Sequence, residues 1–183
     1  MKTRLEKHEL FPDKLPNSFL NRVNETISYL DNENISGNIA DIGEKNPMCI
    51  AIEKHFNITI DSVDFDFNYS FNMKKEYDVI LCFEVLEHLF NPLLFLEQLK
   101  GMLTKGGVIY LSTPYQKPQI LKAIHHYHEI PSDRIEWLFD AAKLNIKSVK
   151  NITIAGNWYN HIYGIRPILR YFQKTRMYKL KSK

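Results

Sequence analysis

The sequence predicts an α/β fold: a Rossmann-like, mostly parallel sheet flanked by helices. Apolar runs of strand length alternate along the chain with amphipathic segments of helix length. Residues 77–83, YDVILCF, form a nearly continuous apolar run, which is typical of a strand covered on both faces. Glycine or polar residues follow each predicted strand, as expected of a sheet that binds its ligand beyond the carboxyl ends of its strands.

The first half of the chain alternates helix and strand. Residues 17–31 place apolar side chains at helical spacing, and Asn17 or Ser18 is the expected N-cap. A buried strand over 38–43 runs into a glycine turn, and a helix over 47–56 and a strand over 57–65 follow.

The second half repeats this alternation. A helix is predicted around 91–103, with Asn91 as its cap and Pro92 in its first turn. Lys105-Gly106-Gly107 is expected to end it and to open the strand VIYLSTP.

The last predicted elements lie between residues 132 and 156. Residues 132–143 read as an amphipathic helix capped by Ser132, and two strands are expected near 145–150 and 151–156. We expect one domain over 1–183, made of a helical cap (1–36), a core (37–156) and a basic, aromatic segment (157–183).

Composition narrows the class of protein. No apolar run reaches the roughly 18 to 20 residues that cross a bilayer, and the charged start of the chain lacks a secretory signal, so a cytoplasmic protein is expected. Cys49 and Cys82 lie among apolar neighbours and are expected to be buried reduced thiols. Residues 141–183 carry ten Lys and Arg and no acid, which suits either an anionic or membrane-associated partner or a terminal element that solvates its charges.

The run YDVILCFEVLEHLFNPLLFLEQLKGMLTKGGVIYLSTP resembles the central signature of class I S-adenosylmethionine-dependent methyltransferases of the small-molecule type, with its EVLEH turn. The resemblance spans residues 77–114 and, with the Asp41-Gly43 turn and the downstream segment, extends from 37 to about 150. It implies S-adenosyl-L-methionine as the cofactor.

The resemblance also implies which residues hold that cofactor. Asp41 and Gly43 match the turn that holds the methionine part. Asp64 fits the ribose-binding acid and Asp66 the adenine-binding acid, with Asp61 as a further candidate for either role. Cys82, Phe83 and Glu84 fall where the family lines the cofactor pocket. An ionised carboxylate suits the ribose because it accepts hydrogen bonds from both hydroxyls.

Two features depart from the family pattern. Gly43 is the one glycine of the usual glycine-rich loop, and Glu44, Lys45 and Asn46 fill the other places. Asp64 and Asp66 lie two residues apart, where the family has a helix and a strand between its two acids. We therefore predict a shortened region between the second strand and the YDVILCF strand, which leaves a reduced sheet with a new edge.

Candidate acceptor-binding residues cluster in HHYHEIP, which contains His125, His126, His128 and Glu129; His88 is a further candidate. Histidine suits a general base because its pKa lies near neutrality. His88, His126 and His128 are the predicted catalytic residues. Two further segments each allow two interpretations. The N-terminal segment around Phe11 is either a lid over the cofactor or a helix packed on the sheet, and the aromatic segment around Trp158 either lines the acceptor pocket or is ordinary packing. The sequence shows no Cys/His metal spacing, so no metal site is predicted.

The predicted function is methyl transfer to a small molecule, with O-methylation of a sugar, a quinone-like or a lipid-linked compound favoured. The alternative is a catalytically inactive binding or scaffold protein, which the thin glycine loop and the missing crossover favour. An RNA methyltransferase ranks third, and nucleic acid is not an expected partner. The catalytic motif Asn/Asp-Pro-Pro-Tyr/Phe, used for methylation of exocyclic amines, is absent after YDVILCF. A nicotinamide dehydrogenase is excluded because G-x-G-x-x-G is missing.

Overall fold

The computed structural model describes residues 15, 17–33, 35–71, 73–115, 126–128, 130–153 and 174–183. The lid residue Phe11, the candidates His125 and Glu129, and the aromatic segment around Trp158 lie outside these ranges.

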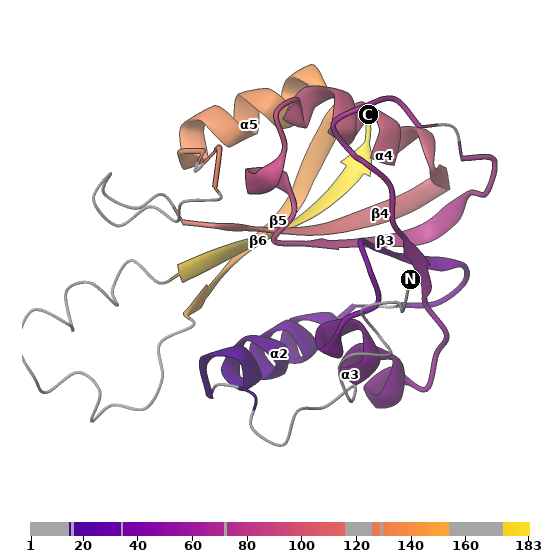
Figure 1. Cartoon of the computed structure of the whole chain (residues 1–183), viewed down its shortest axis with the longest axis vertical. Coiled ribbons are helices and arrows are strands. Elements are labelled where there is room, and N and C mark those ends of the chain that lie inside the picture. Colours follow the sequence, from indigo (N-terminus) through magenta and orange to yellow (C-terminus); the bar gives the residue numbers. More distant parts are fainter. Residues whose placement is uncertain are drawn as a thin grey trace, which may run out of the picture.

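Within the described residues the strands form one sheet in the order β2-β1-β3-β4-β6-β5 (Figure 1). Their bounds are β1 (Ile39–Ile42), β2 (Asp61–Val63), β3 (Tyr77–Phe83), β4 (Leu103–Pro114), β5 (Leu144–Thr153) and β6 (Lys174–Ser182). β1 pairs in parallel with β2 and with β3, and β3 pairs in parallel with β4. β6 is antiparallel to both β4 and β5. The prediction of a mostly parallel sheet is confirmed.

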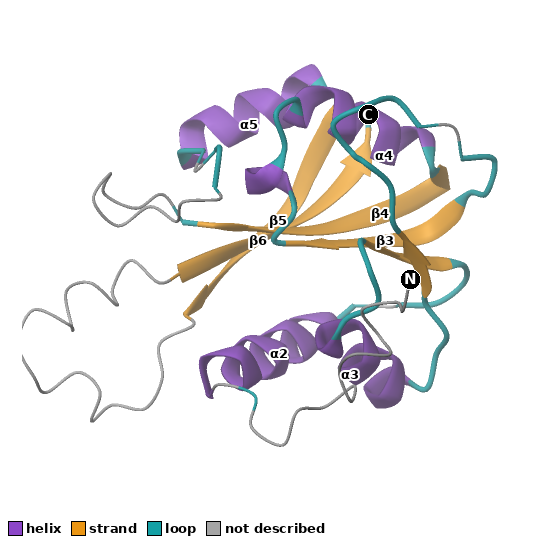
Figure 2. Ribbon diagram, in the orientation of Figure 1, coloured by secondary structure: helices purple, strands orange, loops and turns teal. Residues whose placement is uncertain are grey.

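Helices cover both faces of the sheet (Figure 2). They are α2 (Asn17–Leu30), α3 (Pro47–Phe56), α4 (Pro92–Gly101) and α5 (Ser132–Ala141), with a short 3₁₀ turn, η1 (Leu86–His88). Figure 1 shows α4 and α5 on one face and α2 and α3 on the other. In the part of the chain described, none of the helices is long and apolar enough to span a membrane.

Two apolar cores lie on the two faces because successive strand residues point to opposite sides. Ile80 and Cys82 of β3 pack in the core beneath α4 and α5. Val79 and Leu81 pack in the core with α2 and α3. β3 is therefore buried on both faces, as its apolar run predicts.

The predicted caps hold at α4 and fail at α2 and α5. α2 begins at Asn17, so Asn17 and Ser18 lie inside the helix and neither is its cap. The Asn91 side chain accepts a hydrogen bond from Leu94 N at 3.1 Å and Pro92 opens α4, as predicted. The prediction of Ser132 as a cap is wrong: α5 begins at Ser132, and the cap position is Pro131, which offers no capping side chain.

Three strand predictions need correction. β2 is shorter than 57–65, because Asn57 closes α3 in a left-handed conformation. Gly106 and Gly107 lie inside β4, which continues back to Leu103 to pair with Tyr77 across a register shift. The two strands predicted after α5 are one strand, β5, which pairs with β6 over its whole length.

The shortened region is confirmed. Residues 64–71 and 73–76, which connect β2 to β3, contain neither helix nor strand. β2 has no second neighbour within the described sheet and forms one of its edges. Asp64 and Asp66 therefore lie in a short connection directly after the edge strand.

The described end of the basic segment forms β6, a strand that packs its apolar side chains in the sheet. Met177, Tyr178 and Leu180 are buried. Lys179 pairs with Glu33, and Lys183 pairs with Asp140. Over 174–183 the segment therefore follows the second of the two expectations, a terminal element whose charges are paired or solvated.

Candidate functional site

The carboxyl ends of β1, β2 and β3 meet at one edge of the sheet because the three strands are parallel and adjacent. Gly43 follows β1, Asp64 follows β2 and Glu84 follows β3. The structure thus brings the residues predicted from the glycine turn and the acid series to one edge.

Asp41 is the buried acid of this edge. It lies in β1, is 4% exposed, and its Oδ2 accepts a hydrogen bond from Asn46 Nδ2 at 3.2 Å. Burial raises the pKa of this carboxyl from 3.8 to about 7, an effect that hydrogen bonds from Cys49 and Asn46 oppose. A carboxylate that is this deeply buried is strongly stabilised by a bound cation, because it has lost most of its hydration.

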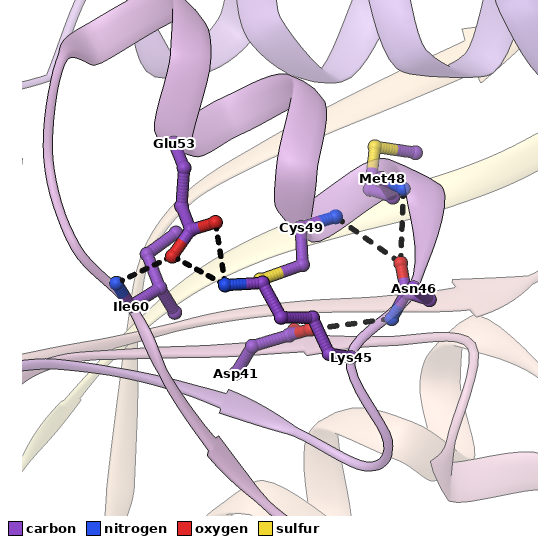
Figure 3. Close-up of polar contacts among 7 residues, drawn as sticks. All are labelled: Asp41, Lys45, Asn46, Met48, Cys49, Glu53 and Ile60. Atoms are coloured by element: carbon purple, nitrogen blue, oxygen red, sulfur yellow. Dashed lines mark hydrogen bonds and ion pairs between the residues drawn. The ribbon is translucent and has the colours of Figure 1, made fainter. Parts of the chain in front are cut away.

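Asn46 connects Asp41 to α3 (Figure 3). Its Oδ1 accepts from Met48 N at 3.0 Å and Cys49 N at 3.1 Å, which caps the helix, while its amide group donates to Asp41. The side chain therefore accepts hydrogen bonds from two backbone amides at the helix N-terminus, and these amides are not available to a ligand. From the sequence, Asn46 has no predicted role beyond filling the place of a glycine, although Asn before Pro47 is a helix-start signal.

Lys45 pairs with Glu53 of α3, and its charge also opposes the burial that raises the pKa of the nearby Asp41 carboxyl. Its Nζ lies 2.7 Å from Glu53 Oε2, and Glu53 also accepts from Ile60 N at 3.0 Å. Figure 3 shows this ion pair on the α3 side of the loop. The residues that replace glycines are thus fixed by contacts within the loop and α3, and they leave the turn at Gly43 open.

Gly43 has a φ of +113°, a conformation that side-chain-bearing residues rarely adopt. Its N donates to Val63 O at 2.7 Å, which ties the turn to β2. A Cβ at this position would meet no atom within 4 Å. The turn therefore faces open space where a ligand can approach the backbone.

Glu84 is strained and fixed at the end of β3. It has a φ of +58°, and its N donates to Ser112 O at 3.1 Å. Its Oε1 accepts from Ser112 Oγ at 2.9 Å. Left-handed backbone at a non-glycine residue is costly and is found often at functional sites.

Arg22 of α2 brings a cation to this edge, and sequence reasoning missed it. Its Nη1 lies 3.8 Å from Glu84 Oε2. Its Nε is buried, and no residue that the structure describes accepts a hydrogen bond from it. The pattern of α2 carried no signal for this role, because it depends on how the helix packs on the sheet.

The Cys82 thiol lies in the field of several carboxylates. Burial, and then repulsion from Glu87, Asp41 and Glu84, raises the pKa of Cys82 well above its ordinary value. Cys82 is fully buried and Phe83 is half-buried. Both cysteines are free and buried, as predicted.

The three candidate aspartates differ in position. Asp61 begins β2 and pairs with Lys75, at the end of the strand opposite Gly43. Asp64 and Asp66 follow β2 and are exposed. Asp66 Oδ1 accepts from Asn68 N at 3.1 Å. The geometry favours Asp64 and Asp66 over Asp61 for a ligand at the carboxyl edge.

The catalytic candidates lie near η1. The rings of exposed His88 and half-buried His126 are 4.9 Å apart and nearly perpendicular. Glu87 O accepts from Tyr127 N at 2.8 Å and His128 N at 3.1 Å, which attaches residues 126–128 to the turn after β3. The structure therefore brings His88, His126 and the backbone of His128 together at η1, the turn that follows Glu84 in the chain.

Residues 19–149, most of the chain, match the model of the methyltransferase domain family. The chain belongs to this family. The expectation of a methyltransferase is confirmed by this match, and the fold agrees with it. The open Gly43 turn and the buried Asp41 thus lie in a methyltransferase domain.

Among curated proteins the domain is similar to a ubiquinone biosynthesis O-methyltransferase of Haemophilus ducreyi, with 27% identity over 104 residues. The match covers 48% of this chain and 44% of the relative. The chain thus spans less than half the length of this relative.

Solved structures share the fold at low identity. An S-adenosylmethionine-dependent methyltransferase from Clostridium acetobutylicum has a TM-score of 0.57 and 11% identity, over 90% of this chain and 92% of that chain. Coclaurine N-methyltransferase bound to N-methylheliamine and SAH has a TM-score of 0.60 and 11% identity, over 87% of this chain and 72% of that chain. Both support the fold alone.

Proposed function

We propose that the domain binds S-adenosylmethionine at the carboxyl edge of β1–β3 and transfers its methyl group to an oxygen of a small molecule. The observation that carries the proposal is the buried Asp41 carboxylate beside the open turn at Gly43. A cationic ligand relieves the unfavourable burial of the carboxylate, and the bare turn leaves room for it.

The donor set fits this cofactor part by part. Asp41 and the Gly43 turn would hold the methionine part, with Asp41 facing its ammonium group. The backbone amides of Met48 and Cys49 already donate to Asn46, so they do not bind the carboxylate of the methionine part. Arg22 offers a cation for that carboxylate instead. Asp64 and Asp66, exposed after β2, would accept hydrogen bonds from the ribose hydroxyls and the adenine amine. Cys82, Phe83 and Glu84 would line the pocket.

When bound, the cofactor supplies a methyl group whose bond to sulfur breaks as the acceptor oxygen's lone pair takes the methyl, leaving S-adenosylhomocysteine and a proton. The chain's residues must then orient the acceptor in line and remove that proton. His88, His126 and His128 are the groups proposed for this, because residues 126–128 are attached to η1, the turn that directly follows the carboxyl end of β3.

The curated relatives favour a quinone-like acceptor, since their names describe O-methylation in ubiquinone biosynthesis. A sugar or a lipid-linked compound belongs to the same class of hydroxyl acceptors. The sequence of the basic segment 157–183 keeps an anionic or membrane-associated acceptor in this proposal, although Lys179 and Lys183 are paired with Glu33 and Asp140.

The test is methyl transfer from S-adenosylmethionine with a labelled methyl group to a short-chain prenylated catechol. We expect label in an O-methyl product. The same catechol with both oxygens already methylated is the control, and it should take no label. Tight cofactor binding without transfer to the catechol, to a monosaccharide or to a lipid-linked sugar would support the alternative of an inactive binding protein.

A further inference from the structure

Three side chains of the types that ligate metal ions meet at the proposed acceptor site. The ligand atoms of Glu87, His88 and His126 all lie within 4.8 Å of one another, and they form the one such group in the described part of the chain. Glu87 and His88 come from η1, while His126 comes from the segment that leads to α5. The group therefore depends on the fold and not on neighbouring positions in the sequence.

The backbone holds these residues in place without an ion. Glu87 O accepts from Tyr127 N and His128 N, and His88 N donates to Val85 O at 3.0 Å. The two imidazole rings contact each other edge to face. Ligands on segments that are already attached to each other lose little freedom when an ion binds.

The chemistry of the donors favours a particular class of ion. Glu87 is 1% exposed, and a carboxylate buried this deeply is stabilised by a nearby positive charge. Each imidazole offers one nitrogen lone pair in its neutral form. One carboxylate oxygen with two imidazole nitrogens suits Zn²⁺, Mn²⁺, Fe²⁺ or Co²⁺, whereas Mg²⁺ and Ca²⁺ prefer oxygen ligands.

We propose that Glu87, His88 and His126 bind a divalent transition-metal ion. Because His88 is exposed, one side of the site faces solvent and leaves coordination positions for an acceptor oxygen. Coordination lowers the pKa of a bound hydroxyl, so its proton passes to water near neutral pH; in the metal-bound chain this route replaces direct proton transfer to His88 or His126, whose nitrogen lone pairs hold the ion. This role in methyl transfer rests on the proposed function; the binding of the ion does not.

The sequence pattern predicted no metal site because it contains no Cys/His spacing typical of metal ligands. Glu87-His88 and His126 are separated by a helix and a strand, α4 and β4. Their proximity arises because β3 and β4 are adjacent in the sheet, which places the segments that follow them side by side.

The test is titration of the chelator-treated chain with Co²⁺ in the absence of S-adenosylmethionine, followed by visible d–d absorption and by calorimetry. We expect one equivalent to bind and to produce bands of nitrogen and oxygen ligation. His126→Ala and His88→Ala should each weaken binding by at least about 10-fold. Both side chains reach solvent, so these variants are safer for folding than a change at buried Glu87, and thermal melts check that they fold.

His55→Ala is the matched control. His55 Nε2 lies 2.7 Å from Asp31 Oδ1, so it is also a histidine beside a carboxylate, but on the exposed side of α3. Co²⁺ binding should be unchanged in this variant. Absence of Co²⁺ uptake by the folded chain, or equal affinity in His126→Ala and the unaltered chain, would overturn the metal site. Separate calorimetry with S-adenosylmethionine distinguishes this failure from failure of the proposed function.

Discussion

Replacing Asp41 by asparagine is expected to weaken S-adenosylmethionine binding by about 10- to 150-fold, the equivalent of one charged hydrogen bond of about 1.5 to 3 kcal/mol. The shape of the side chain is retained, but its charge is lost. Because the pKa of Asp41 is raised to about 7, affinity in the unaltered chain should rise as the pH rises through 7. The variant should lack this pH dependence, and calorimetry at several pH values measures both effects.

The same substitution should stabilise the chain without ligand. The folded state holds the Asp41 proton more tightly than the unfolded state, whose pKa is near 3.8, so stability falls as the pH rises from about 4 to 7. At pH 8 the ionised carboxyl costs at most about 4 kcal/mol. Asp41→Asn should therefore melt higher than the unaltered chain at pH 8 and similarly at pH 4.

Asp61→Asn is the control for this prediction, because Asp61 lies at the opposite end of β2 and pairs with Lys75. It should leave cofactor affinity and its pH dependence unchanged. Equal affinities for the Asp41→Asn variant and the unaltered chain would show that the buried carboxylate does not face the ligand.

Replacing Gly43 by valine is expected to abolish cofactor binding and to lower stability by about 1 to 3 kcal/mol. The stability loss follows from the φ of +113°, since a Cβ at this position meets no other atom. The binding loss has a separate cause, because the valine side chain would fill the open space beside Asp41. Chemical denaturation and calorimetry measure the two effects independently.

Gly106→Val separates these causes. Gly106 also has a positive φ, +92°, and open space at its Cβ, but it lies in β4 near the amino edge of the sheet. This variant should lose a similar amount of stability and keep its cofactor affinity. Loss of affinity in both variants would attribute the effect at Gly43 to general destabilisation.

Much of the architecture could be predicted because it is encoded locally. The bounds of β3 follow from its apolar run, and the start of α4 follows from Asn91-Pro92. The shortened region follows from the small number of residues between Val63 and Tyr77. β5 could not be predicted as one strand, because it is held by pairing with β6 from a distant part of the chain.

The candidate site was predictable in composition but not in environment. The strand order brings Asp41, Gly43 and Glu84 to one edge, as their place after the strands predicts. The double role of Asn46, the approach of Arg22 and the meeting of Glu87 with His126 arise from tertiary contacts. The burial that shifts the pKa of Asp41 arises in the same way.

The measurement that tests the central claim most directly is calorimetric titration of the chain with S-adenosylmethionine. We predict saturable binding of one cofactor per chain, with an affinity that Asp64→Ala lowers by about 10-fold or more through loss of the hydroxyl contacts. Absence of heat and of any thermal shift at millimolar cofactor, with the chain folded, would contradict the account.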